Sequence, residues 1–262
     1  MITFMNTVSS THLTVLTGAS RGLGRAIAEQ LLRQPGRQQV LCISRRSDEP
    51  LAALAREAGS TLLQWTLDLA EPQQAAERLG QWLQGLDAQA FDTAALINNA
   101  GTIAPPRPLA EVQLGDVAHA LRVGLEAPML LTAAFLHATR DWRAQRKVLN
   151  ISSGLGRNAM ASQAPYCAAK AGMDHFSRAV ALEEASSSNG ARIVSLAPGV
   201  IDTDMQVQLR GSDPQQFPDR MRFVQLKQEG QLDTPAVAAE KVLRFLARAD
   251  FGSSPVADVR KD

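Results

Sequence analysis

Short apolar segments alternate with longer helical patterns through most of this 262-residue chain. We predict strands at residues 13–17, 40–44, 61–67, 94–98, 147–152 and 192–196. We predict helices at residues 23–33, 50–57, 72–83, 114–138, 166–186 and 234–247. This alternation predicts an α/β fold, a doubly wound, Rossmann-type parallel sheet with helices on both faces. Ligands of such sheets bind beyond the carboxyl ends of the strands.

The chain is long enough for one large core, and we find no internal repeat or linker. Its hydrophobic content of 45% and charged content of 20% are typical of a globular protein. We therefore expect a single domain over residues 1–262. The helical pattern breaks between residues 200 and 231, and this segment is either a lid over the site or a solvated loop.

Charge and apolar patterning exclude several classes of partner. A net charge of +1 gives no electrostatic basis for binding nucleic acid or an anionic membrane, and no apolar run reaches ~18 residues. Residues 1–10 lack the features of a secretory signal. Cys42, Cys167 and the four histidines fit no metal-ligand spacing, and two thiols make no disulfide framework. We expect a cytoplasmic protein with reduced thiols and no resident metal.

A glycine-rich turn follows the first predicted strand and opens the first predicted helix. Its sequence is Thr17-Gly18-Ala19-Ser20-Arg21-Gly22-Leu23-Gly24. Glycines let the backbone approach a pyrophosphate closely, and free N–H groups at the start of the helix bind it. The glycine spacing differs from G-x-G-x-x-G, but the position between strand and helix still predicts a dinucleotide site.

The end of the second strand indicates which dinucleotide is bound. Enzymes that use NAD generally place a carboxylate there to bind the ribose 2′-hydroxyl. In this chain Ser44 is followed by Arg45 and Arg46. Two guanidiniums, with Arg21 nearby, suit a 2′-phosphate, although both could simply be solvated. We therefore predict NADPH/NADP as the cofactor.

Polar residues also end the third and fourth strands. Asp68 could accept a hydrogen bond from an adenine amino group, or it could cap the following turn. The fourth strand ends in Asn98-Asn99-Ala100-Gly101, whose small residues would let a cofactor pass and whose amides would hold neighbouring strands together.

Tyr166 and Lys170 are four residues apart in a predicted helix that has Pro165 in its first turn. Residues at this spacing share a helix face, so the ammonium would lie beside the phenol. A neighbouring cation lowers the pKa of a phenol from about 10, which would make Tyr166 a usable proton donor or acceptor. Taken alone, such a pair is more often two surface neighbours.

Together these features resemble the short-chain dehydrogenase/reductase superfamily. Its glycine turn, Asn-Asn-Ala-Gly segment, Ser…Tyr-x-x-x-Lys set and Pro-Gly segment all occur here in order. The resemblance implies that Ser153, Tyr166 and Lys170 are catalytic, with Tyr166 as proton donor, and that Lys170 also holds the nicotinamide ribose. The cofactor-binding residues predicted from the motifs and the resemblance are Gly18, Ser20, Arg21, Gly22, Leu23, Gly24, Ser44, Arg45, Arg46, Asp68, Leu69, Asn98, Ala100, Gly101, Tyr166, Lys170, Pro198, Gly199, Val200, Ile201 and Thr203.

A narrower resemblance, at residues 100–105, 150–156 and 197–206, is to bacterial benzil reductases, relatives of sepiapterin reductase. It implies an NADPH-dependent carbonyl reductase that transfers hydride to a ketone or an aromatic 1,2-diketone and forms a hydroxy ketone such as (S)-benzoin. One alternative is an NADPH-binding sensor or scaffold with impaired catalysis, and another is a reductase of a pteridine or sugar ketone. In the family, helices corresponding to 114–138 and 166–186 commonly form interfaces, so we expect a homodimer or homotetramer.

One residue departs from the superfamily pattern. An asparagine usually occupies the helix between the fourth and fifth strands and supports a water on a proton path from the lysine to solvent. Gly124 stands at that position and retains only a backbone carbonyl for the water. Glycine also weakens a helix by up to about 1 kcal/mol relative to alanine. We expect a slower proton relay, which Gly124→Asn would accelerate.

Overall fold

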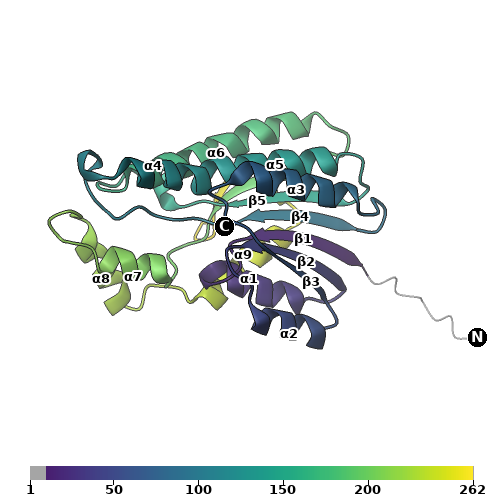
Figure 1. The fold of residues 1–262 in the computed structure, drawn as a ribbon, viewed down its shortest axis with the longest axis horizontal. Helices are drawn as coiled ribbons and strands as arrows, with labels where there is room; N and C mark the ends of the chain where they lie inside the picture. The colour runs from purple at the N-terminus through teal and green to yellow at the C-terminus, as the bar shows by residue number, and fades with distance from the viewer. Residues whose placement is uncertain (1–9, 262) are drawn as a thin grey trace, which may run out of the picture.

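The structure is a computed structural model and describes residues 10–261. Within this range, parallel strands form a seven-stranded sheet in the order β3-β2-β1-β4-β5-β6-β7 (Figure 1). The strands are β1 (Thr11–Thr17), β2 (Arg37–Ser44), β3 (Thr61–Thr66), β4 (Thr93–Asn98), β5 (Gln145–Ile151), β6 (Arg192–Ala197) and β7 (Val256–Asp258). The predicted doubly wound parallel sheet is confirmed. Residues 1–9, where we expect no secretory signal, lie outside the described range.

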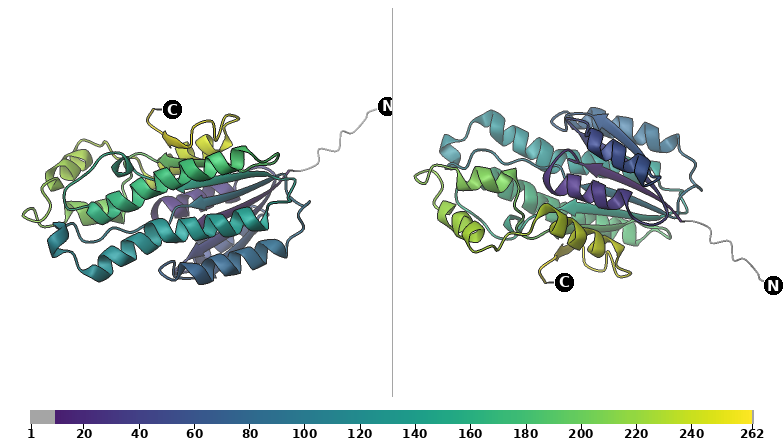
Figure 2. Two further views of the ribbon diagram at one scale, coloured as in Figure 1. Left: turned by 90° about the horizontal axis from the view of Figure 1, so that it is seen from above. Right: turned by 90° about the horizontal axis from the view of Figure 1, so that it is seen from below.

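Helices cover both faces of the sheet (Figures 1 and 2). One face carries α1 (Gly22–Leu32), α2 (Glu49–Glu57) and α9 (Pro235–Ala247). The other carries α3 (Pro72–Gln84), α4 (Leu114–Leu121), α5 (Ala127–Ala138) and α6 (Ala164–Ala185). Side chains alternate along each strand, so β1 sends Leu16 into the core below α1 and Leu13 into the core below α5.

The short β7 strand is absent from the sequence prediction. Three residues are too few to show an alternating pattern, and Pro255 precedes them. The strand pairs in parallel with β6, with Ser195 opposite Val256 and Ala197 opposite Asp258. This pairing carries the C-terminal segment to the same end of the sheet as the carboxyl ends of the other strands.

The predicted helix over residues 114–138 is interrupted by a π-helical turn. This turn, Arg122–Glu126, joins α4 to α5 and contains Gly124. Pro128 contributes to the interruption, because proline has no N–H to donate to the carbonyl of Gly124, four residues earlier. Turns of this kind occur mostly as single insertions in α-helices, frequently at functional sites.

The segment between residues 200 and 231 contains two short helices, α7 (Asp204–Arg210) and α8 (Arg220–Gln228). They lie at one end of the sheet (Figure 1) and enclose a small apolar cluster of their own. Its buried members are Ile103, Leu209, Phe217 and Phe223. Because Tyr166 packs against this cluster, the segment stands beside the predicted catalytic residues rather than in open solvent.

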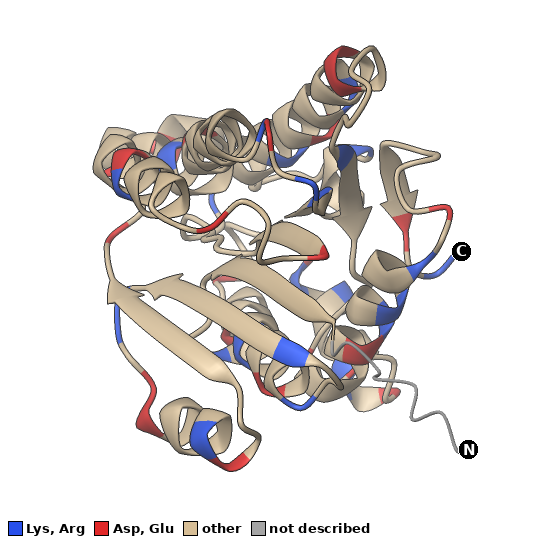
Figure 3. Cartoon of the chain, turned by 90° about the vertical axis from the view of Figure 1, so that its right-hand side faces the viewer, with Lys and Arg blue, Asp and Glu red and all other residues tan. Residues whose placement is uncertain are grey.

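Charged residues of both signs are interspersed over the helices and loops on the side of the molecule shown in Figure 3. No helix among residues 10–261 combines the length and the apolar character needed to cross a membrane.

Candidate active site

The carboxyl ends of the strands and the α7–α8 segment surround a cavity of about 940 Å³. Ser153, Tyr166 and Lys170 all line it. So do all the predicted cofactor-binding residues except Arg46 and Asn98. The fold therefore brings together, from distant parts of the sequence, almost every residue that the motifs selected.

The glycine turn between β1 and α1 forms one wall of this cavity. Gly18 has a φ of +74° and Gly22 a φ of +54°, values that favour glycine. A side chain at Gly24 would place its Cβ 2.2 Å from the carbonyl oxygen of Gly18, where there is no room for it. The backbone of this turn therefore carries no side chains where a pyrophosphate would have to approach, and the turn fits a dinucleotide.

The paired asparagines at the end of β4 tie neighbouring strands together, as expected. The Asn98 side chain donates to Asn150 Oδ1 on β5 (2.9 Å), and the Asn99 side chain donates to the carbonyl oxygen of Thr17 on β1 (3.0 Å). Asn98 does not line the cavity, so it supports the site from beneath. Asp68 does line the cavity, and its Oδ1 also accepts from the backbone N–H of Ala70 (2.9 Å).

Cations gather where β2 meets the cavity. Arg45 is exposed and lines the cavity, whereas the neighbouring Arg46 is exposed outside it. Arg21 forms an ion pair with Asp204 of α7 (2.7 Å). Both side chains of this pair are largely exposed, and such pairs contribute only about 0–1 kcal/mol. Arg21 can therefore exchange Asp204 for a phosphate at little cost.

The three predicted catalytic residues meet where β5 ends and α6 begins. Ser153 follows β5, and its hydroxyl hydrogen-bonds that of Tyr166 and accepts from the N–H of Leu155 (3.1 Å). Lys170 lies one turn further along α6, with its Nζ 5.6 Å from the centroid of the Tyr166 ring. The Lys170 ammonium donates to the carbonyl oxygen of Ile151 (2.7 Å).

A family model described as short chain dehydrogenase matches residues 12–213. The chain belongs to the short-chain dehydrogenase family. This match confirms the superfamily resemblance. Members of the family are oxidoreductases that use NAD(H) or NADP(H).

Similar proteins span almost the whole of this dehydrogenase. Benzil reductase ((S)-benzoin forming) of Bacillus cereus is 36% identical over 242 residues, which are 92% of this chain and 96% of the relative. Sepiapterin reductase of Rattus norvegicus is 34% identical over 256 residues, 93% of this chain and 94% of the relative. The crystal structure of KRED1-Pglu enzyme superimposes with a TM-score of 0.79 at 28% identity, covering 94% of this chain and 99% of that chain.

The expectation that Lys170 lowers the pKa of Tyr166 is wrong for this structure of the dehydrogenase. Although the Tyr166 side chain is only half-buried, surrounding protein atoms desolvate the phenol and raise its pKa to about 12. The hydrogen bond from Ser153 acts in the opposite direction but is the smaller effect. Burial also lowers the pKa of Lys170 to about 8, while the negative charge of Asp174 raises it. The ammonium is bound to the Ile151 carbonyl rather than to the phenol.

Beyond the predicted catalytic and cofactor-binding residues, the cavity has a further wall. Much of it is apolar and comes from Ile103, Leu155, Met160, Val123, Met205, Leu209, Phe223 and Leu226. Two buried amides also line it, and Gln163 Nε2 and Gln206 Oε1 have no hydrogen-bond partner among residues 10–261. Gln163 lies three residues before Tyr166, but nothing in the local sequence distinguishes either glutamine from a surface residue.

Proposed function

We propose that this dehydrogenase uses NADPH to reduce a ketone, or one carbonyl of an aromatic 1,2-diketone, to a hydroxy ketone. The observation that carries the proposal is the convergence of Ser153, Tyr166 and Lys170 on a cavity with a largely apolar wall. The likeness to benzil reductase over nearly the whole chain supports this substrate class.

The residues present fit NADPH. The bare glycine turn at the start of α1 would hold the pyrophosphate, and Arg45 with Arg21 would hold a 2′-phosphate. When bound, NADPH supplies the hydride that adds to the carbonyl carbon, which is chemistry of the cofactor and not of the protein.

The protein's own contribution is to hold and move a proton. With a pKa raised to about 12, Tyr166 is a neutral phenol at neutral pH, so its hydroxyl is a donor for the developing alkoxide. The Ser153 hydroxyl lies within hydrogen-bond reach of the Tyr166 hydroxyl and can orient the same substrate oxygen. Lys170, with a pKa lowered to about 8, can exchange a proton close to neutral pH one helical turn from Tyr166. Proton donation from a neutral tyrosine is the transfer that carbonyl reduction requires.

The wall of the cavity favours an aromatic ketone with a second polar group. Apolar side chains such as Met160, Leu209 and Phe223 stabilise aromatic rings by removing their surface from water. The unpartnered Gln163 Nε2 and Gln206 Oε1 offer one donor and one acceptor within that wall. A second carbonyl or a hydroxyl on the substrate would satisfy one of them, which would be worth about 1–3 kcal/mol.

The experiment that tests the proposal follows NADPH absorbance with benzil as substrate, with NADH alongside and Tyr166→Phe as control. Consumption of NADPH that disappears in the Tyr166→Phe variant would support a tyrosine-dependent diketone reductase. Turnover of pterin or sugar ketones in place of benzil would change the substrate class. Tight NADPH binding without turnover of any of these ketones would instead identify a binding protein and overturn the proposal.

We expect Arg45→Glu to weaken the preference for NADPH. Charged hydrogen bonds contribute about 1.5–3 kcal/mol, so kcat/KM for NADPH should fall roughly tenfold to a hundredfold while that for NADH rises. The matched control is Arg37→Glu, which makes the same charge change on an exposed residue at the start of β2, outside the cavity. Equal effects of the two substitutions on NADPH would show a general charge effect and contradict the assignment.

A further inference from the structure

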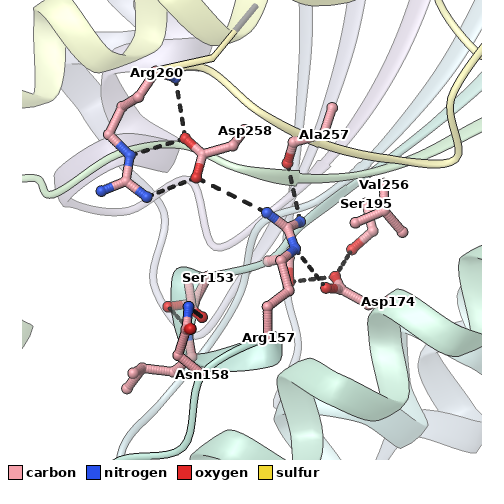
Figure 4. A network of polar contacts seen from close by, with 12 residues as sticks. Ser153, Arg157, Asn158, Asp174, Ser195, Val256, Ala257, Asp258 and Arg260 are labelled. Atoms are coloured by element: carbon pink, nitrogen blue, oxygen red, sulfur yellow. Dashed lines mark hydrogen bonds and ion pairs between the residues drawn. The ribbon is translucent and has the colours of Figure 1, made fainter.

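The side chain of Asp174 binds both ends of the loop that carries Ser153 (Figure 4). Asp174 lies on α6, one turn beyond Lys170, and is only 2% exposed. Its Oδ1 accepts from the hydroxyl of Ser152 (2.6 Å), the residue before Ser153. Its Oδ2 accepts from Nε of Arg157 (3.0 Å), four residues after Ser153. One carboxylate therefore holds the loop before and after the predicted catalytic serine.

The same loop is in direct contact with the backbone of α6. A Cβ at Gly156 would lie 2.9 Å from the carbonyl oxygen of Lys170 and 3.0 Å from Oδ2 of Asp174. The 3-10 turn Gly154–Gly156 can approach α6 this closely only because Gly156 has no side chain. Any displacement of this turn would move Ser153 relative to Tyr166, which α6 carries.

The C-terminal segment holds the outer side of Arg157 (Figure 4). Nη2 of Arg157 donates to the carbonyl oxygen of Ala257 in β7 (3.0 Å), and Nη1 lies 3.9 Å from Oδ2 of Asp258. Asp258 also accepts from Nε and Nη2 of Arg260 (2.9 and 2.6 Å). Ser195 on β6 donates to Asp174 Oδ1 (2.6 Å), so the network joins β6, β7 and α6 to the loop that follows β5.

We propose that Asp174 and Arg157 are positioning residues that fix Ser153 against Tyr166, with β7 bracing Arg157. Neither side chain is placed to touch the reacting atoms, and both act through the Ser153 loop. An ion pair that only stabilised the fold could lie anywhere in the molecule, whereas this one, with Asp174 buried and Arg157 partly exposed, lies on the loop of a predicted catalytic residue. The effect on turnover rests on the proposed function, but the effect on geometry does not.

Tyr166 is the only tyrosine in the chain, which gives a readout that needs no turnover. Tyrosine labelled with ¹³C at the ζ carbon yields one NMR signal, and that carbon bears the hydroxyl that bonds Ser153. Ser153→Ala defines the position of the signal without this hydrogen bond. We expect Arg157→Gln and Asp174→Asn to move the signal towards that position, and Arg157→Lys to restore it in part. Arg178→Gln, an exposed charge change one turn beyond Asp174 on α6, is the matched control and should leave the signal unchanged.

Turnover gives the second readout. We expect Arg157→Gln to lower kcat by about ten- to a hundredfold with KM for NADPH unchanged, because a small misplacement near the chemistry is costly while the cofactor wall stays intact. A wild-type signal from folded Arg157→Gln protein would overturn the proposal and leave Arg157 a structural residue. If Asp174→Asn fails to fold, Arg157→Gln decides the question, since the Arg157 side chain is 27% exposed. A wild-type protein that reduces no ketone would overturn the proposed function, while the NMR comparison would still test the positioning.

Discussion

Lys170 is a cation that the fold has almost removed from water. Its side chain is 4% exposed, and its ammonium donates to the carbonyl oxygen of Ile151. Burial lowers the pKa of Lys170 from the ordinary 10.5 to about 8, although the nearby Asp174 carboxylate acts in the opposite direction. A group that exchanges its proton near neutral pH suits proton transfer, and the same property makes the stability of the protein depend on pH.

We expect the free energy of unfolding to rise with pH between about 8 and 10.5 because of Lys170. Below about pH 8 the lysine is protonated in both states, so its contribution is constant. Between the two pKa values the unfolded chain keeps the proton and the folded protein does not, so stability rises with pH by at most about 1.4 kcal/mol per pH unit. Urea unfolding of wild type and Lys170→Met at both ends of this interval measures the difference. Parallel pH profiles of the two proteins would contradict it.

At the scale of elements, α6 packs closely on the π-helical turn that contains Gly124, the residue at the position of the superfamily asparagine. A Cβ at Gly124 would lie 3.2 Å from the Cβ of Ala169, the residue before Lys170. A contact this short requires the neighbour to move by a few tenths of an ångström. The sequence around Gly124 does not reveal this contact, because a residue on another helix creates it.

Because of this contact, we expect Gly124→Asn alone to destabilise the protein by about 1–3 kcal/mol, the usual cost of overpacking, and to lower turnover by shifting Lys170 rather than to raise it. Ala169→Gly in the same chain makes room for the new side chain. A double-mutant cycle measured by urea unfolding should then show favourable coupling between the two substitutions. If the amide supports the relay, the double variant should also turn over faster than Ala169→Gly alone. A stable and faster Gly124→Asn single variant would show that the contact imposes no restriction.

The elements differ in how far the sequence predicts them. The glycine turn and the Tyr166–Lys170 pair are each formed by residues close in the chain, so the sequence spacing predicts both their local structure and their place at the cavity. β7 could not be predicted, because three residues become a strand only through their pairing with β6. The Asp174 network could not be predicted either, because its partners Ser152 and Ser195 lie 22 and 21 residues away. The sequence does not decide between lid and loop for residues 200–231, whereas the structure has two short helices there whose apolar cluster contacts Tyr166.

At the scale of the whole molecule, the helices on one face expose large apolar side chains. Leu114 on α4 is 88% exposed, Met129 on α5 is 40% exposed and Leu182 on α6 is 78% exposed. Scattered single apolar residues are normal on a protein surface, but these three belong to helices that cover the same face of the sheet (Figures 1 and 2). We expect these residues to contact a second copy of the chain, because identical surfaces related by a two-fold axis bury each other's apolar residues.

We expect the protein to form a homodimer, or a homotetramer built from such dimers, through this face. Leu182→Arg places a charge in the contact and should lower the mass measured by sedimentation velocity by a factor of two. Val237→Arg is the matched control, since Val237 is 41% exposed on α9, on the opposite face of the sheet. Association would also affect the position of the catalytic residues, because α6 carries Tyr166 and Lys170 in its first turns and Leu182 near its end. The Leu182→Arg variant should therefore lose turnover as well as mass, while a wild-type protein that sediments as a monomer would exclude the interface.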